Sequence, residues 1–279
     1  MAFFLGIVVA IGWAVSWYFN DPAMLVFAFI FALVVNVGSY WYSDKVVVAM
    51  SGAKPASENE YEGLHNIVEN LAITAGLPKP KVYIISDQAP NAFATGRDAE
   101  HAVVAVTTGL LSILDKNELE GVIAHELSHI GNRDMLVSTV AVVLVGFISI
   151  VADFFLRASL FGGNRDNGRG NPIVAVVAAA LIIVAPIIAT LLQLAISRKR
   201  EFLADASGAL LTRYPEALAS ALKKISGYPV PLKRASSATA HLYISNPFGP
   251  GAARSAVMRL FSTHPPVEER VAALVGKRD

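Results

Sequence analysis

Long stretches without charge dominate the hydrophobic pattern of this chain. Residues 1–19, 22–42, 136–156 and 172–197 contain one charged residue between them, Asp153. An α-helix rises 1.5 Å per residue, so about 20 apolar residues cross the roughly 30 Å hydrocarbon core of a bilayer. The pattern therefore predicts four transmembrane helices, arranged as two hairpins that leave both large polar regions on one side of the membrane.

Two alternatives remain open for these stretches. The first stretch could be a cleaved signal peptide, although it lacks a basic segment at its start and a second apolar run follows after Asn20 and Asp21. The third and fourth could form a buried hairpin in a soluble protein. Their length without lysine or arginine favours membrane spans.

The polar regions have the shorter periodicities of a folded domain. They predict helices over 57–75, from 115 onward, over 215–225 and over 267–275, and short strands over 81–86, 91–96 and 101–107. The predicted fold class is α+β, a mainly helical membrane protein whose polar domain carries a small β-sheet. The predicted organisation is a hairpin over 1–42, a first polar part over 43–134, a second hairpin over 135–197 and a second polar part over 198–279.

Composition agrees with a membrane protein and excludes several functions. The hydrophobic fraction is 54% and the charged fraction 16%, against about 45–50% and about 25% in soluble domains. The net charge of +1 gives no broad basic surface for nucleic acid. Because the chain has no cysteine, disulfides, thiolate nucleophiles and cysteine-bound zinc are excluded. Any metal must be held by histidine and carboxylate.

The basic residues near the ends of the predicted spans indicate an orientation. The side with the polar parts carries Lys45, Arg133, Arg198, Lys199 and Arg200, and the opposite side carries Arg157, Arg165 and Arg169. Positively charged residues are enriched on the cytoplasmic side of membrane proteins. We therefore expect the polar domain to face the cytoplasm.

The helix predicted from residue 115 contains His125-Glu126-Leu127-Ser128-His129. Residues four apart share one helix face, about 5–6 Å between Cβ atoms, so both imidazoles can reach one tetrahedral metal ion. Glu126 can approach a water molecule beside the metal without being a ligand, which suits a general base. The alternative is an exposed helix with two ordinary histidines. The apolar neighbours instead predict a buried helix, in which these polar side chains need partners.

A catalytic zinc site needs a third protein ligand, and Glu201 is the best candidate. Glu201 and Asp205 share one helix face, so Glu201 could bind the metal while Asp205 accepts a hydrogen bond from a ligand histidine. Taken alone, this pair also fits a solvated helix face. The pair directly follows the fourth predicted span and His129 closely precedes the third, so the hairpin would bring the two motifs together.

These motifs together resemble the HtpX family of membrane zinc metallopeptidases, relatives of the CAAX prenyl-protein proteases. The resemblance rests on the two motifs above, on residues 91–96 (Asn-Ala-Phe-Ala-Thr-Gly) and on His264-Pro265-Pro266 followed by Arg270. It implies a gluzincin-like catalytic domain with one Zn²⁺ per chain, in a bacterial inner membrane, cleaving membrane or misfolded proteins under stress. Self-cleavage in the loop over 228–262 is a further expectation.

The resemblance also implies roles for the remaining motif residues. Asn91 and Ala92 would lie on an edge strand that pairs with extended substrate. His264 and Arg270 would face the cleft and stabilise the developing oxyanion or the substrate carbonyl. Two rival functions stay open: a prenyl-protein protease, for which four spans look too few to enclose a lipid, and an inactive metal-stabilised scaffold, which would not need Glu126.

Overall fold

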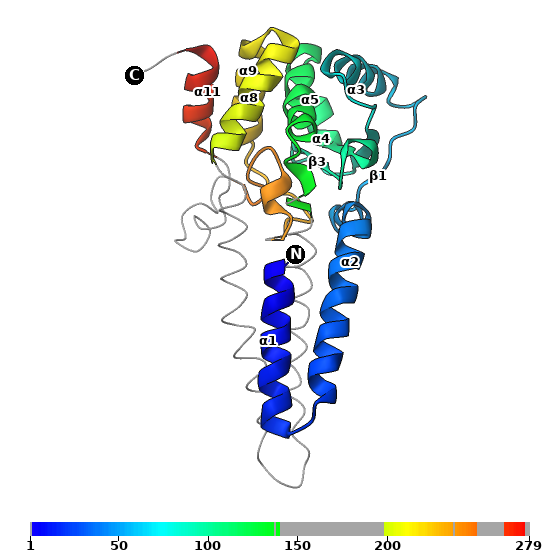
Figure 1. Ribbon diagram of the computed structural model, residues 1–279. Coiled ribbons are helices and arrows are strands. Elements are labelled where there is room, and N and C mark those ends of the chain that lie inside the picture. Colours follow the sequence, from blue (N-terminus) through cyan, green and yellow to red (C-terminus); the bar gives the residue numbers. More distant parts are fainter. Residues whose placement is uncertain (1, 137, 140–197, 237, 250–264, 277–279) are drawn as a thin grey trace. The chain divides into compact units, whose positions relative to one another are not determined.

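The computed structural model describes residues 2–136, 138–139, 198–236, 238–249 and 265–276 (Figure 1). The chain divides into two compact units, one comprising Met1–Ser43 with Val140–Leu191 and the other comprising Asp44–Thr139 with Leu192–Asp279. Almost all of the third and fourth predicted spans, together with His264, lies outside the described residues.

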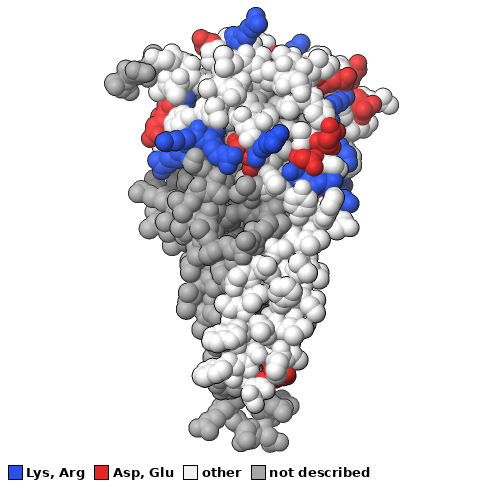
Figure 2. Space-filling view, in the orientation of Figure 1, with Lys and Arg blue, Asp and Glu red and all other residues white. Residues whose placement is uncertain are grey.

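The described part of the first unit consists of helix α1 (Ala2–Phe19) and most of helix α2 (Ala23–Ser51), whose last residues from Asp44 belong to the second unit. The Asp21 side chain accepts a hydrogen bond from the Ala23 N–H at 2.9 Å in the turn between the two helices. Among the described residues, α2 is the one helix long and apolar enough to cross a bilayer by length and composition. Large apolar side chains such as Phe27 and Val34 are exposed along it, and Figure 2 shows its surface almost free of charge.

The second unit contains a four-stranded sheet in the order β1-β2-β4-β3. The strands are β1 (Lys54–Pro55), β2 (Lys81–Ile85), β3 (Ala92–Thr95) and β4 (Val103–Thr107). Strands β2 and β4 are parallel, whereas β3 and β4 are antiparallel with Ala92 opposite Val106. The three predicted strands are confirmed, and the short β1 is an addition. This order places β3 at one edge of the sheet.

Helix α5 (Lys116–Gly131) runs through the middle of the second unit and contacts β3 and three helices (Figure 1). Val122, Ile123 and Leu127 are buried on it, so the prediction of a buried helix is confirmed. The other elements are α3 (Glu62–Ala75), α4 (Thr108–Ile113), α8 (Arg198–Thr212), α9 (Pro215–Ser226), α11 (Val267–Val275) and the 3₁₀ turns η1 (Ala99–His101) and η2 (Ala240–Leu242).

Two predicted helix boundaries had different outcomes. The capping pattern at Ser57 does not open a helix: α3 begins at Glu62, and the Ser57 carbonyl accepts the Tyr61 N–H in a preceding turn. The pattern at Asp115 does cap α5, because Asp115 and Glu118 each accept the backbone N–H of the other. Glu118 also accepts hydrogen bonds from Ser220 and Lys224 of α9. Tertiary contacts therefore support the second cap.

Glu118 should make the stability of the fold depend on pH. Burial raises the pKa of its carboxyl group, but hydrogen bonds from Lys224 and Ser220 lower this pKa by a larger amount, to a net value below the ordinary 4.5. The charged form therefore stabilises the fold above pH 4.5, and this contribution is lost as the pH falls through the lower pKa of the folded state.

We expect Glu118→Gln to have a flatter profile of unfolding temperature between about pH 6 and about pH 3 than the parent protein. The full chain in detergent is used for both. Glu120→Gln, on a more exposed position of the same helix, is the control and should keep the parent profile. Equal slopes for the parent and Glu118→Gln would contradict the prediction.

Candidate metal site

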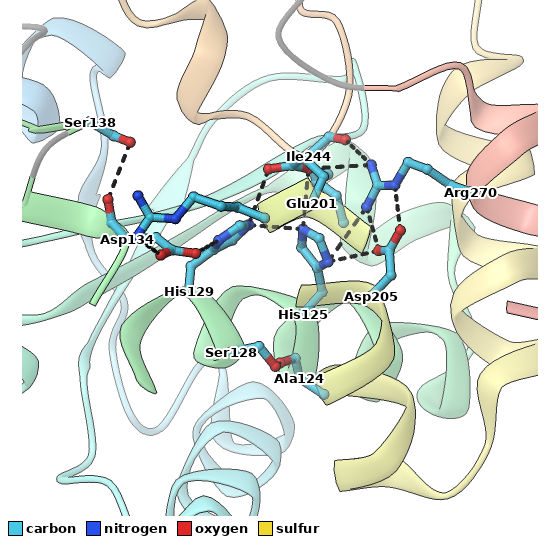
Figure 3. A network of polar contacts seen from close by, with 11 residues as sticks. Ala124, His125, Ser128, His129, Asp134, Ser138, Glu201, Asp205, Ile244 and Arg270 are labelled. Carbon is cyan, nitrogen blue, oxygen red and sulfur yellow. Dashed lines mark hydrogen bonds and ion pairs between the residues drawn. The ribbon is translucent and has the colours of Figure 1, made fainter. Parts of the chain in front are cut away.

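Helices α5 and α8 bring the predicted ligands together at close quarters. A Cβ atom added at Gly208 of α8 would lie 2.9 Å from the backbone nitrogen of His125. Glycine at this position therefore allows the two helices to approach closely. As a result Glu201, which precedes Gly208 by seven residues on the same helix, lies against the histidines of α5 (Figure 3).

The distances among these side chains suit a tetrahedral ion. The Nε2 atoms of His125 and His129 are 3.2 Å apart, and the Glu201 oxygens lie 3.5 Å from Nε2 of His129 and 3.9 Å from Nε2 of His125. Ligands at about 2.0–2.1 Å from a tetrahedral zinc are roughly 3.4 Å apart. The three residues form a group that could bind a metal, as the sequence predicted.

The surroundings of the two imidazoles favour a positive charge between them. Nδ1 of His125 lies 2.9 Å from Asp205, and Nδ1 of His129 lies 3.2 Å from Asp134. A proton on each Nδ1 lets it donate to its carboxylate, which directs the lone pairs of both Nε2 atoms toward the same point. A cation would satisfy two lone pairs and a carboxylate there, so the donor set fits a metal.

The pKa values of the two imidazoles differ because their surroundings differ. Burial lowers the pKa of His129, but the contacts with Asp134 and Glu201 raise it by a larger amount, to a net value of about 9. Burial lowers the pKa of His125 to about 4, despite its contact with Asp205. One imidazole is thus held neutral, and neighbouring carboxylates favour a proton on the other.

Glu126 lies beside this group and is 1% exposed. Burial raises the pKa of its carboxyl group to about 7, a value that suits a group that takes up and releases a proton near neutral pH. Among the described residues its Oε1 atom has no hydrogen-bond partner. A buried carboxylate oxygen without a partner is costly, so a water molecule at this point would satisfy it.

A small cavity connects these side chains. It is lined by Ala94, His125, Glu126, His129, Asp134, Met135, Ser138, Arg200, Glu201, His241, Leu242 and Ile244. Three of these polar residues, Asp134, Ser138 and His241, were not singled out from the sequence. The signal for Asp134 was its place just after the histidine motif, whereas nothing in the local sequence marked His241.

Arg270 lies close to the candidate ligands, with its Nη1 atom 3.9 Å from Oε2 of Glu201. Its guanidinium group is buried, donates to both oxygens of Asp205 at 2.6 and 2.8 Å, and donates to the Ile244 carbonyl at 3.0 Å. It is absent from the cavity lining among the described residues. A buried guanidinium needs fixed acceptors, and Asp205 supplies them behind His125. Asp205 itself contacts His125, as predicted.

Part of the edge of β3 contacts another segment of the same chain. The Ala92 carbonyl accepts the Ile244 N–H at 2.9 Å, and the Asn91 side chain makes hydrogen bonds with the backbone of Ser245 in both directions. Phe93 pairs with Tyr243 in an isolated bridge. Residues 243–245 thus satisfy part of the sheet edge beside Asn91 and Ala92, through an isolated bridge and these hydrogen bonds.

Replacement of Arg270 should destabilise the protein strongly. Burial raises the pKa of Asp205, but hydrogen bonds from Arg270 and His125 lower it to about 2, so Asp205 stays charged. Arg270→Met would leave this buried charge without its main partner, and such losses cost about 3–5 kcal/mol. Chemical denaturation of the full chain measures the change. Lys79→Met removes an exposed ion pair with Glu69 and should change stability far less. Equal changes would contradict a structural role for Arg270.

The fold and the site together define a class of protein. A buried helix carries two histidines and a glutamate, a second helix adds a carboxylate, and all four meet at one cavity beside an edge strand. This is the arrangement of a metallopeptidase. Comparison with known families gives the particular one: the chain belongs to peptidase family M48, whose model matches residues 58–278.

Its relatives place the chain further. It is 47% identical over 274 residues to the Protease HtpX homolog of Caldanaerobacter subterraneus subsp. tengcongensis, covering 96% of this chain and 90% of that protein. It is 50% identical over 277 residues to the Protease HtpX homolog of Pyrococcus furiosus, covering 98% and 92%. These findings confirm the resemblance to the HtpX family, and the protein is a membrane-associated metalloprotease.

A solved structure supports the fold. The crystal structure of S. mikatae Ste24p matches with a TM-score of 0.54 and 18% sequence identity, covering 96% of this chain. The chain spans 62% of the length of that protein. At this identity the likeness establishes the fold.

Proposed function

We propose that the protein is a zinc-dependent endopeptidase with a gluzincin-like catalytic domain that holds one Zn²⁺ through His125, His129 and Glu201. The observation that carries this proposal is the convergence of the three ligand atoms, which all lie within 4.8 Å of one another, beside the Glu126 oxygen that has no partner among the described residues. Its substrates would be membrane or misfolded proteins, as part of quality control under stress.

Different residues of the chain would have different roles in peptide hydrolysis. A bound zinc ion would polarise the scissile carbonyl and lower the pKa of water at the site toward 7. Glu126 would take the proton from the attacking water and pass it to the leaving amine. Its raised pKa suits both steps, because the group can then hold the proton briefly near neutral pH. Asp205 would orient His125.

The residues that line the cavity would shape the cleft through which the substrate enters. Asn91, Ala92 and Arg270 hold residues 243–245 in place, and through them Ile244 lines the cavity. We therefore propose that these three residues shape the substrate cleft through this segment and would pair with substrate directly only where the segment moves aside. For His264, which lies outside the described residues, contact with substrate stays a proposal.

We also propose that the site lies near the cytoplasmic surface of a bacterial inner membrane. His129 precedes Leu136, where the third predicted span begins, by seven residues. A continuous helix would set this distance at about 10 Å, but α5 ends at Gly131 and Arg133 has a φ of 60°, so that value does not apply. Seven residues still reach no more than roughly 25 Å. Membrane proteins with exposed tails, and the chain itself through self-cleavage, would then lie within reach.

Proteolysis by the purified full-length protein in detergent or nanodiscs tests the function. An unfolded soluble protein and a membrane protein with an unstructured cytoplasmic tail serve as substrates. We expect cleavage with zinc, loss of cleavage on chelation, and recovery when zinc is added back. Cleavage that is equally fast after complete removal of metal would refute the proposal.

A further inference from the structure

We propose that Asp134 is a positioning residue for the metal site, and that Arg200 holds Asp134 in the position from which it orients His129. The inference rests on the proposed zinc endopeptidase and adds two residues to its machinery. It follows from the local turn after α5, from the contacts of the Asp134 carboxylate and from the different exposure of the two histidines.

A sharp turn at the end of α5 brings Asp134 back to His129. The helix ends at Gly131 with Asn132 as its C-cap. Arg133 then has a backbone φ of 60°, in the left-handed region that residues other than glycine rarely adopt. The Asp134 N–H then donates to the His129 carbonyl at 3.0 Å. The Asp134 carboxylate therefore lies beside the imidazole ring of His129.

The two oxygens of Asp134 have different partners. Oδ2 lies 3.2 Å from Nδ1 of His129 (Figure 3), and Oδ1 forms an ion pair with Arg200. Arg200 directly precedes Glu201, whose oxygen lies 3.5 Å from Nε2 of His129. The contacts thus form a closed ring that joins the end of α5 to the start of α8 through two of the three metal-binding side chains.

Each histidine has the same kind of support on its Nδ1 atom. Behind His125 stand Asp205 and Arg270, which are both buried. Behind His129 stand Asp134 and Arg200, at the rim of the cavity. The His129 side chain is 17% exposed, against 1% for His125. Because packing restrains His129 less, its orientation depends more on the hydrogen bond that its Nδ1–H donates to Asp134.

The pair also has a particular place in the sequence. Asp134 precedes and Arg200 follows the segment 140–197, so their ion pair ties together the two chain segments that lead into and out of it. Any displacement of one segment against the other would act on the carboxylate that orients His129.

Metal affinity measured by competition with a chelating dye tests the proposal without relying on activity. Asp134→Asn in the full-length protein should bind zinc about 10–100-fold more weakly, as losses of such hydrogen-bonding partners do. Arg200→Gln should weaken binding by a smaller factor, and Arg200→Lys should restore it. If Arg200 acts through Asp134, the two losses will not add in the double variant.

A matched control and a second readout separate positioning from general damage. Asp98→Asn removes another Asp–His contact, the exposed one to His101 at 2.6 Å, and should leave zinc affinity unchanged. In the cobalt-substituted protein, the visible absorption should shift for Asp134→Asn and stay constant for Asp98→Asn. Unchanged affinity and spectrum in Asp134→Asn would overturn this inference alone. A parent protein that binds no zinc and cleaves nothing would overturn the proposed function as well.

Discussion

Replacement of Glu126 by glutamine should lower the rate of peptide hydrolysis by a factor of about 10²–10⁴ or more while zinc stays bound. Glutamine has nearly the same size and cannot accept a proton from water. Glu126 is not among the three residues whose ligand atoms converge, so its loss should leave the metal in place. Because burial raises the pKa of this carboxyl group to about 7, a neutral side chain should not destabilise the fold.

Rates on an unfolded substrate, together with the zinc content of the same preparation, check this prediction. Glu120→Gln, which lies on the same helix with a more exposed side chain, is the matched control and should keep both rate and zinc. Loss of zinc in proportion to loss of rate would show that Glu126 is a ligand. An unchanged rate would show that another group serves as the base.

Removal of the third ligand should have the largest effect on metal binding. Glu201→Ala leaves only His125 and His129, and a catalytic zinc site uses three protein ligands. Its affinity should therefore fall by more than the roughly 10–100-fold expected for the loss of a hydrogen-bonding partner. Glu201 is 1% exposed and lies within 3.9 Å of both Nε2 atoms, so no neighbouring water-exposed carboxylate can easily take its place.

A graded series of variants makes this prediction specific. Zinc affinity should decrease in the order Glu216→Ala, Asp205→Asn, Glu201→Ala. Glu216 is an exposed residue of α9 and serves as the control, and Asp205 contacts His125 without belonging to the converging group. Full zinc content in Glu201→Ala would place the third ligand elsewhere. Equal losses for Asp205→Asn and Glu201→Ala would remove the distinction between ligand and orienting residue.

The sequence by itself determined the elements whose cause is local. Period and capping residues predicted α5, including the reciprocal cap of Asp115 and Glu118. Spacing alone placed His125 and His129 on one face, because residues four apart in a helix are neighbours whatever surrounds them. The uncharged runs predicted the apolar helices α1 and α2 for the same reason, since length and composition are sequence properties.

Some local signals were overruled by contacts made elsewhere in the fold. The capping pattern at Ser57 resembles that at Asp115, yet only the second opens a helix. The difference is that Glu118 is also held by Ser220 and Lys224 of α9. Capping contributes only about 1 kcal/mol, so tertiary packing decides between similar patterns.

Only the tertiary structure decided the partners of the polar side chains. Arg270 binds Asp205 across 65 residues, and Asn91 binds Ser245 across 154, separations at which no periodicity reports contact. Asp134 reaches His129 because the chain reverses at Arg133, whose left-handed conformation its residue type does not predict. A buried charge or an open strand edge must find a partner. Which partner it finds depends on the packing of the whole domain, and for that reason the sequence indicated the chemistry of the metal site while the fold selected the residues that support it.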